Sequence, residues 1–510
     1  METHNPQSYS AANARALIGV SLFFGLLFDY FFYDKIPGIA FPIYCILIVA
    51  GLFGLAYFLK KQIRKQVFWL LVPLIFFSAM VFVRSSELLT LLNVAASLLL
   101  LLTIAEVSFG EKVKNFLVGD YIKIFLLPFQ FIHPLFKTLS TVFSRSGAQR
   151  DQKKVSQVVK GVVMAIPFLV VFLLLFSSAD LIFQKYVSDF ITLDIEPQTI
   201  FQSLLVLIAT LVFLGAYSYI FREKGDQIAA QKKSTGQSVG HIESSILLGS
   251  VNILFFFFIL VQVAYLFAGE SNISSQGFTY AEYARRGFFE LITVALVSLL
   301  LLLSTEKYVV KKETDHALGF KLLSTALTVQ VIIIMASAFT RLSLYEEAYG
   351  FTTLRLYSHA FTLFLAVVFC LLLYKIYRDK RENTFAFRVF ISIVLFLAAI
   401  NFLNPDAFIA RRNIERFAAT GKLDTDYLSR LSSDAIPDTI KMVTISNEDL
   451  RKGFARKLYW RAQNADSPYF SKWQSLNISR MRAEKILHSK MRELEPYKEY
   501  QQQNFDSVGR

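Results

Sequence analysis

The sequence predicts an all-α fold, a polytopic bundle of about eleven transmembrane helices followed by a polar helical tail. Hydrophobic residues make up 54% of the 510-residue chain and charged residues only 18%, whereas a soluble protein has about a quarter charged. The mean hydropathy is also positive, at +0.46. The apolar residues gather in runs of roughly twenty, the length that crosses a bilayer core as a helix. These observations exclude a soluble globular protein.

Eleven apolar runs have the length of a span. They cover residues 15–33, 38–59, 67–83, 88–107, 161–183, 199–221, 244–268, 288–309, 319–340, 356–377 and 386–404. The first run is followed by FDYFFYDK and lacks a small-residue cleavage site, so we expect a retained span rather than a signal peptide.

The chain divides into four parts by composition. These are the first four spans (1–107), a basic cytoplasmic or interfacial connector (108–160), a seven-helix core (161–404) and a helical tail (405–510). The connector holds an apolar stretch, 120–140, that is broken by Pro128 and Pro134, so we expect it in the interface or as a re-entrant segment. The tail is rich in arginine, lysine and aromatic residues, and we expect its helices to lie against a headgroup surface or the bundle.

Lysine and arginine concentrate in alternate loops, as in KKQIRK (60–65) and YRDKRE (377–382). By the positive-inside rule, the N-terminus is predicted to be cytoplasmic and the C-terminus extracytoplasmic. The net charge of +14 then reflects this bias and attraction to anionic lipid, so we expect membrane lipids and no nucleic acid as partners. Cys45 and Cys370 both lie in apolar runs, so no disulfide framework is expected.

Charged residues open the span that begins near residue 288. Glu282, Arg286 and Glu290 follow one another at i+4 spacing, so on a helix they share a face and can pair. Glu290 would lie about a turn inside the hydrocarbon, where an unpaired carboxylate is costly. We therefore expect it to face the bundle within reach of an arginine, with Arg286, Arg341 and Arg355 as candidates.

The last four predicted spans carry acids, arginines and tyrosines at their predicted extracytoplasmic ends. We predict a ligand-binding cluster there, formed by Glu282, Arg285, Arg286, Glu290, Arg341, Tyr345, Glu346, Arg355, His359, Asn404, Asp406, Arg411 and Arg412. The alternative is that such residues are interfacial anchors or fasten helices together. We favour fastening for Glu282–Arg286 and recognition for Arg355 and His359.

Sequence motifs of enzymes and cofactor sites are absent: there is no HExxH, P-loop, GxSxG or CxxC. We therefore expect no metal and no cofactor, assign no catalytic residue, and consider an enzyme the less favoured class. The centres of the spans carry only amides, notably Asn93, Asn252, Gln262 and Gln330. A coupled transporter usually has ionisable groups there, so transport is also less favoured.

Three stretches, YAEYARRGFFEL, RLSLYEEAYGFTTLRLY and NPDAFIARRNIERF, carry a resemblance to a known family. Over roughly residues 160–440 the chain resembles a bacterial family of multi-pass membrane proteins labelled domain of unknown function 4173. The resemblance implies a protein of the bacterial cytoplasmic (inner) membrane, with no established activity, substrate or cofactor.

Two classes of function stay open. The first is a binding, sensing or scaffold protein of the envelope that contacts a lipid headgroup, a lipid-linked ligand or an envelope protein. The second is a transporter or a membrane-embedded transferase acting on a lipid-linked substrate. A continuous polar path past Asn93, Asn252 and Gln330 would favour transport, whereas an outer cleft above a closed cytoplasmic half would favour binding or headgroup chemistry.

Overall fold

The structure is a computed structural model that describes residues 11–110, 112–143, 197–221, 241–267, 288–308, 314–378, 381–465 and 472–499. Within these ranges every regular element is a helix, and ten helices are long and apolar enough to cross a membrane. The predicted all-α polytopic fold is confirmed. The predicted span at 161–183 lies outside the described residues.

The long helices follow the predicted spans closely. They are α1 (Ala11–Phe32), α2 (Ala40–Phe58), α3 (Gln66–Val83), α4 (Glu87–Val107), α10 (Pro197–Phe221), α11 (His241–Phe267), α14 (Phe288–Tyr308), α15 (Thr314–Tyr349), α16 (Thr353–Tyr377) and α17 (Glu382–Leu403). The clearest difference is α15, which was expected to end near residue 340. It continues to Tyr349 because no helix breaker occurs before Gly350, whose left-handed backbone (φ 83°) ends it.

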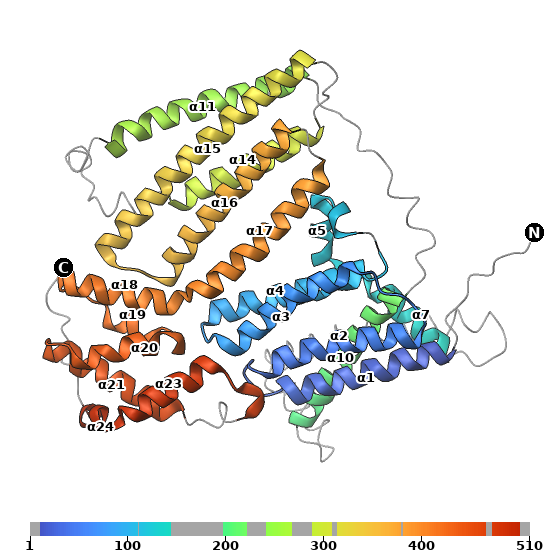
Figure 1. The fold of residues 1–510 in the computed structure, drawn as a ribbon, viewed down its shortest axis with the longest axis horizontal. Coiled ribbons are helices and arrows are strands. Elements are labelled where there is room, and N and C mark those ends of the chain that lie inside the picture. Colours follow the sequence, from blue (N-terminus) through green and yellow to red (C-terminus); the bar gives the residue numbers. More distant parts are fainter. Residues whose placement is uncertain are drawn as a thin grey trace, which may run out of the picture.

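The helices pack in two groups that α17 joins (Figure 1). In the first, α10 packs beside α1 to α4: the Phe24 ring of α1 lies 5.4 Å from Phe213 and 6.1 Å from Tyr217, both on α10. In the second, α11, α14, α15 and α16 share a core. Helix α17 contributes Phe390 to the first group and Phe385 to the second. The packing therefore groups α10 with the first four spans.

Three short helices follow α4: α5 (Val118–Phe125), α6 (Leu127–Gln130) and α7 (Ile132–Phe143). Of these, α5 lies near the start of α17, whereas α7 packs against α1 and α10. They are amphipathic. Ile124 and Phe131 are buried, whereas the Phe125 and Phe129 side chains are exposed. A hydrogen bond of 3.3 Å from the Val118 amide to Glu382 Oε1 ties α5 to α17. The longest of the three has 12 residues, which is shorter than the about 20 residues that cross a bilayer core.

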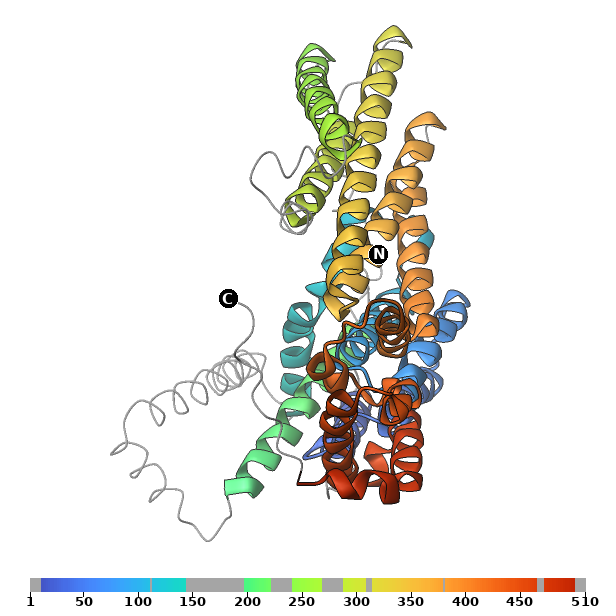
Figure 2. The same ribbon diagram turned by 90° about the vertical axis from the view of Figure 1, so that its left-hand side faces the viewer.

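The C-terminal residues fold into a helical unit, here called the tail domain (405–465 and 472–499). Its core is largely its own and includes Phe454, Leu458 and Leu487, and α16 adds Leu356 to it. Its longer helices are α18 (Pro405–Thr420), α19 (Thr425–Arg430), α21 (Glu448–Ala465) and α23 (Ile478–Ser489). Figures 1 and 2 show it at one end of the long helices, facing the viewer in Figure 2. The sequence predicted its helices but not this separate core.

Candidate functional site

The tail domain is fastened to the turn between α3 and α4 by one buried carboxylate. Asp434 is only 5% exposed. Its Oδ2 accepts hydrogen bonds from the backbone amides of Ser85 and Ser86, at 2.7 and 3.0 Å, and from Ser85 Oγ at 3.0 Å. Arg84 Nη1 lies 3.8 Å from the other carboxylate oxygen. This contact brings the tail domain directly over the ends of two transmembrane helices.

A second set of contacts holds the segment around η4 (Trp473–Ser475) against the same end of the bundle. The Ile39 amide donates to the Leu476 carbonyl at 2.9 Å. The Asn477 amide group donates to the carbonyls of Val81 and Arg84, at 3.1 and 2.8 Å. The turns after α1 and after α3 are thus both covered by the tail domain.

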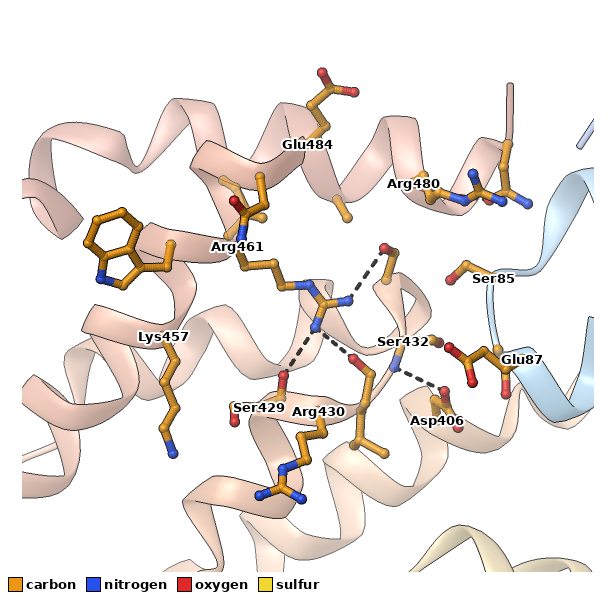
Figure 3. A pocket seen from close by; sticks show the side chains of 18 of the residues that line it. Ser85, Glu87, Asp406, Ser429, Arg430, Ser432, Lys457, Arg461, Arg480 and Glu484 are labelled. Carbon is orange, nitrogen blue, oxygen red and sulfur yellow. Dashed lines mark hydrogen bonds between the residues drawn. The ribbon is translucent and has the colours of Figure 1, made fainter. Parts of the chain in front are cut away.

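Between these two attachments lies a cavity of about 990 Å³, walled by residues 85–88 on one side and by α19, α21 and α23 on the other (Figure 3). Most of its charged lining residues are basic. The cationic side chains are Arg430, Arg456, Lys457, Arg461 and Arg480, and the acidic ones are Glu87, Asp406 and Glu484. Serine hydroxyls from 85–86 and 429–433 add further donors.

Two of the arginines are held by backbone carbonyls. Arg461 Nη1 donates to the carbonyls of Leu431 (2.6 Å) and Ser429 (3.3 Å), as Figure 3 shows. Arg480 donates to the carbonyls of Pro37 (3.2 Å) and Ser475 (3.4 Å). Burial lowers the pKa of both guanidinium groups. Because arginine starts from so high a pKa, both stay charged at neutral pH. They therefore shape the wall and keep it positive.

The other three cations differ in how far neighbouring residues engage them. Lys457 pairs with Asp426, and burial lowers its pKa while the charge of Asp424 opposes the change. Arg430 is exposed, and in the part of the chain that the structure describes it makes no hydrogen bond or ion pair. The Nε of Arg456 is buried without a hydrogen-bond acceptor among the same residues. Arg430 and Arg456 are thus the cations best placed to bind a ligand.

Apolar side chains also line the cavity and remain partly exposed. Trp460 and Met481 are each 50% exposed, Leu88 39% and Leu476 36%. A lining that combines guanidinium groups, hydroxyls and accessible apolar surface suits a molecule with an anionic end and an apolar end.

Part of the predicted cluster does come together, in the hairpin of α15 and α16. His359 Nδ1 lies 3.2 Å from Glu346 Oε2, and both side chains are largely buried. The Arg355 guanidinium stacks over the Tyr345 ring, 4.1 Å from its centre. Arg341 is buried on the same helix, α15. The structure thus joins Tyr345, Glu346, Arg355 and His359 as neighbours.

The NPDAFIARR stretch does not join that group. Asn404 ends α17 in a left-handed conformation (φ 53°), and α18 starts at the next residue. Asp406 faces the cavity and accepts from the Ser432 amide at 3.1 Å. Arg411 and Arg412 lie on the surface, paired with Asp438 at 3.3 Å and Glu415 at 3.1 Å. Asp406 and Arg411 diverge because five residues turn a helix by about 500°, which leaves them about 140° apart.

The expectation that Glu290 faces the bundle is wrong, since its side chain is exposed. Glu290 lies in the first turn of α14, where unpaired backbone N–H groups favour a carboxylate at the surface. Glu282, Arg285 and Arg286 lie outside the described residues.

Sequence reasoning missed the cavity residues Arg430, Arg456, Lys457, Trp460, Arg461 and Arg480. A usable signal was present on α21. Arg456 and Trp460 are four residues apart, as are Lys457 and Arg461, so one helix face carries three cations and an indole. No group of three His, Cys, Asp or Glu side chains that could hold a metal occurs in the described residues.

Comparison with known proteins identifies a family but no described activity. No curated protein and no solved structure matches the chain. The family described as "Domain of unknown function (DUF4153)" matches residues 71–442, which is more than half of the chain. The family inferred from the resemblance, domain of unknown function 4173, is therefore wrong. The expectation that the chain belongs to a family of unknown function is confirmed. This integral membrane protein belongs to the DUF4153 family.

Proposed function

We propose that the protein binds an anionic lipid or lipid-linked molecule through the cavity beneath the tail domain. The observation that carries this proposal is the basic lining, with five cationic side chains against three acidic ones, at the end of the transmembrane helices. A volume of about 990 Å³ lies at the upper end of the range of ligand pockets, about 300–1,000 Å³. The ligand's phosphate or carboxylate would contact Arg430 and Arg456, and its apolar part would lie along Trp460 and Met481.

The hydrogen bonds of the amide side chains within the helices favour binding over transport. Asn93 and Asn401 bond to each other reciprocally, at 2.9 and 2.8 Å, and join α4 to α17. Asn252 donates to the Leu323 carbonyl at 3.1 Å, and Gln330 donates to the Asn252 carbonyl at 3.2 Å, which joins α11 to α15. These amides fasten two separate pairs of helices, an arrangement that suits a scaffold better than a polar path.

The binding proposal is tested on full-length protein in detergent. Binding of short-chain phosphatidylglycerol should exceed binding of the matching phosphatidylcholine. The double variant Arg430→Gln/Arg456→Gln should weaken phosphatidylglycerol binding at least tenfold, because each charge-assisted hydrogen bond contributes about 1.5–3 kcal/mol. Native mass spectrometry or microscale thermophoresis gives the dissociation constants.

The matched control is Arg411→Gln/Arg412→Gln, which removes two arginines from the same domain outside the cavity. It should leave the affinity unchanged. Equal loss in both double variants, or none in the first, would contradict the proposal. Inorganic phosphate serves as a further probe: if it binds as tightly as phosphatidylglycerol, the ligand is a free anion rather than a lipid.

We further propose that the protein lies in a bacterial cytoplasmic membrane with its tail domain outside. The support is the alternation of lysine- and arginine-rich loops, which sets KKQIRK (60–65) at the end of the bundle opposite the tail domain. With Cys45 and Cys370 replaced by alanine, Lys485→Cys in intact cells should react with a membrane-impermeant maleimide, and Lys60→Cys should react only after lysis. Both native lysines are exposed. The reverse pattern would refute this orientation.

A further inference from the structure

A serine completes the His359–Glu346 pair in the hairpin of α15 and α16. Ser343 Oγ lies 3.3 Å from His359 Nε2, and Glu346 Oε2 lies 3.2 Å from His359 Nδ1 on the other side of the ring. Ser343 and Glu346 are three residues apart on α15, so they share a face, and His359 reaches them from α16. A hydroxyl, an imidazole and a carboxylate in this order have the relative placement of a nucleophile, its base and the group that orients the base.

The imidazole is held in this position by its surroundings. The Phe339 ring packs against it with 4.2 Å between ring centres. Glu346 is only 4% exposed, and its second oxygen is buried without a hydrogen-bond donor among the described residues. A buried carboxylate of this kind favours a proton on the facing Nδ1, which leaves Nε2 able to accept from Ser343. The Ser343 hydroxyl has a second acceptor in the Phe339 carbonyl, at 3.1 Å. The Phe339 carbonyl, 3.2 Å from Nε2, can accept from that nitrogen once it is protonated.

We propose that Ser343, His359 and Glu346 hydrolyse a carboxylic ester of a membrane amphiphile. Ser343 Oγ attacks the ester carbonyl while its proton passes to His359 Nε2. The tetrahedral intermediate expels the alcohol, which takes that proton, and an acyl-serine remains. Water then attacks the acyl carbon and gives a proton to His359 Nε2. The second tetrahedral intermediate collapses, Ser343 Oγ takes that proton back from His359, and the carboxylic acid is released. Glu346 is a positioning residue that stabilises the imidazolium. The reaction needs no co-reactant besides water.

The depth of Ser343 in the membrane defines the substrate class. It lies six residues before the end of α15 at Tyr349, which is about 9 Å along the helix. The interfacial layer on each side of the hydrocarbon core is about 5–8 Å thick, so Ser343 lies near the boundary where a lipid's ester carbonyls are found. Arg355, one turn nearer the helix mouth than His359, provides a positive charge for the headgroup. This inference does not depend on the cavity beneath the tail domain.

The test uses purified full-length protein, a fluorophosphonate probe and p-nitrophenyl butyrate. The wild-type protein should become labelled on a peptide that contains Ser343 and should hydrolyse the ester. Ser343→Ala should abolish labelling and lower kcat at least a thousandfold, and His359→Gln should lower kcat a hundred- to ten-thousandfold. Glu346→Gln should lower kcat more than it raises KM, and Glu346→Asp should recover part of the loss.

Ser358→Ala is the control, because Ser358 neighbours His359 in sequence but has no place in the array, and it should label and turn over normally. The proposal is overturned if the wild-type protein is not labelled by the probe and does not hydrolyse the ester. It is also overturned if Ser343→Ala is still labelled or still hydrolyses the ester. If the array has only a structural role, His359→Gln should have a lower thermal midpoint and the wild-type protein should not hydrolyse the ester. Arg430→Gln/Arg456→Gln should leave labelling unchanged, so a failure of lipid binding in the cavity is distinguishable from a failure here.

Discussion

Replacing Asp434 with alanine should detach the tail domain from the α3–α4 turn and destabilise that junction by about 3–5 kcal/mol. The carboxylate is buried and accepts from two backbone amides and the Ser85 hydroxyl. Its loss leaves the two amides without this acceptor and Arg84 without its buried counter-charge, whereas the Ser85 hydroxyl keeps Ser479 Oγ at 3.3 Å. Limited proteolysis in detergent should then cut the tail domain much faster, while the transmembrane helices stay intact.

Asp434→Asn should fall between the wild type and the alanine variant, since it keeps an acceptor but loses the charge. Glu415→Ala is the control in the same domain. Glu415 is 62% exposed and pairs with Arg412 on the surface, where such a pair contributes at most about 1 kcal/mol. If Asp434→Ala and Glu415→Ala are cleaved at the same rate, the carboxylate does not hold the junction.

Replacing Lys375 with methionine should destabilise the second helix group by about 3–5 kcal/mol. Lys375 is 3% exposed, and its Nζ lies 2.5 Å from Glu306 Oε2, which joins α16 to α14. Without the ammonium group, the largely buried Glu306 carboxylate loses this close counter-charge. The thermal midpoint in detergent, followed by far-ultraviolet circular dichroism, measures the loss.

The double variant Lys375→Met/Glu306→Gln should recover much of that loss, because it also removes the carboxylate charge that faced the ammonium group. The exposed pair of Lys490 and Glu493 gives a matched control, and Lys490→Met should change the midpoint little. A double variant less stable than Lys375→Met would show that the cost comes from packing rather than from charge.

The spans could be predicted because a bilayer imposes one length on every helix that crosses it. The same pattern says little about how helices pair, since lipid-facing and helix-facing positions are equally apolar. That is why α10, which packs on α1 through Phe213 and Tyr217, was expected in the later core. The extension of α15 to Tyr349 was missed for a different reason. A polar stretch after a span looks like a loop unless the position of the next helix breaker, Gly350, is considered.

The candidate site was predictable where neighbours in sequence are neighbours in space. Glu346 and His359 lie on two helices joined by a short turn, so their contact follows from the hairpin alone. The cavity could not be found this way, because its wall combines residues from 85–88, α19, α21 and α23. Only the packing of the tail domain brings these segments together, and that packing depends on its separate core.

The attachment of the tail domain has a consequence for the order in which the chain is assembled. The bond between Ile36 and Ser475 joins residues 439 positions apart, and the Ser85–Asp434 bond joins residues 349 apart. Since chains are synthesised from the N-terminus, the first two hairpins enter the membrane long before their partners exist. Until the last residues are synthesised, the amides of these turns can donate only to water or to other parts of the chain. Docking of the tail domain is therefore the closing event of biogenesis, and it can occur only in a chain whose preceding helices have all inserted in the correct direction.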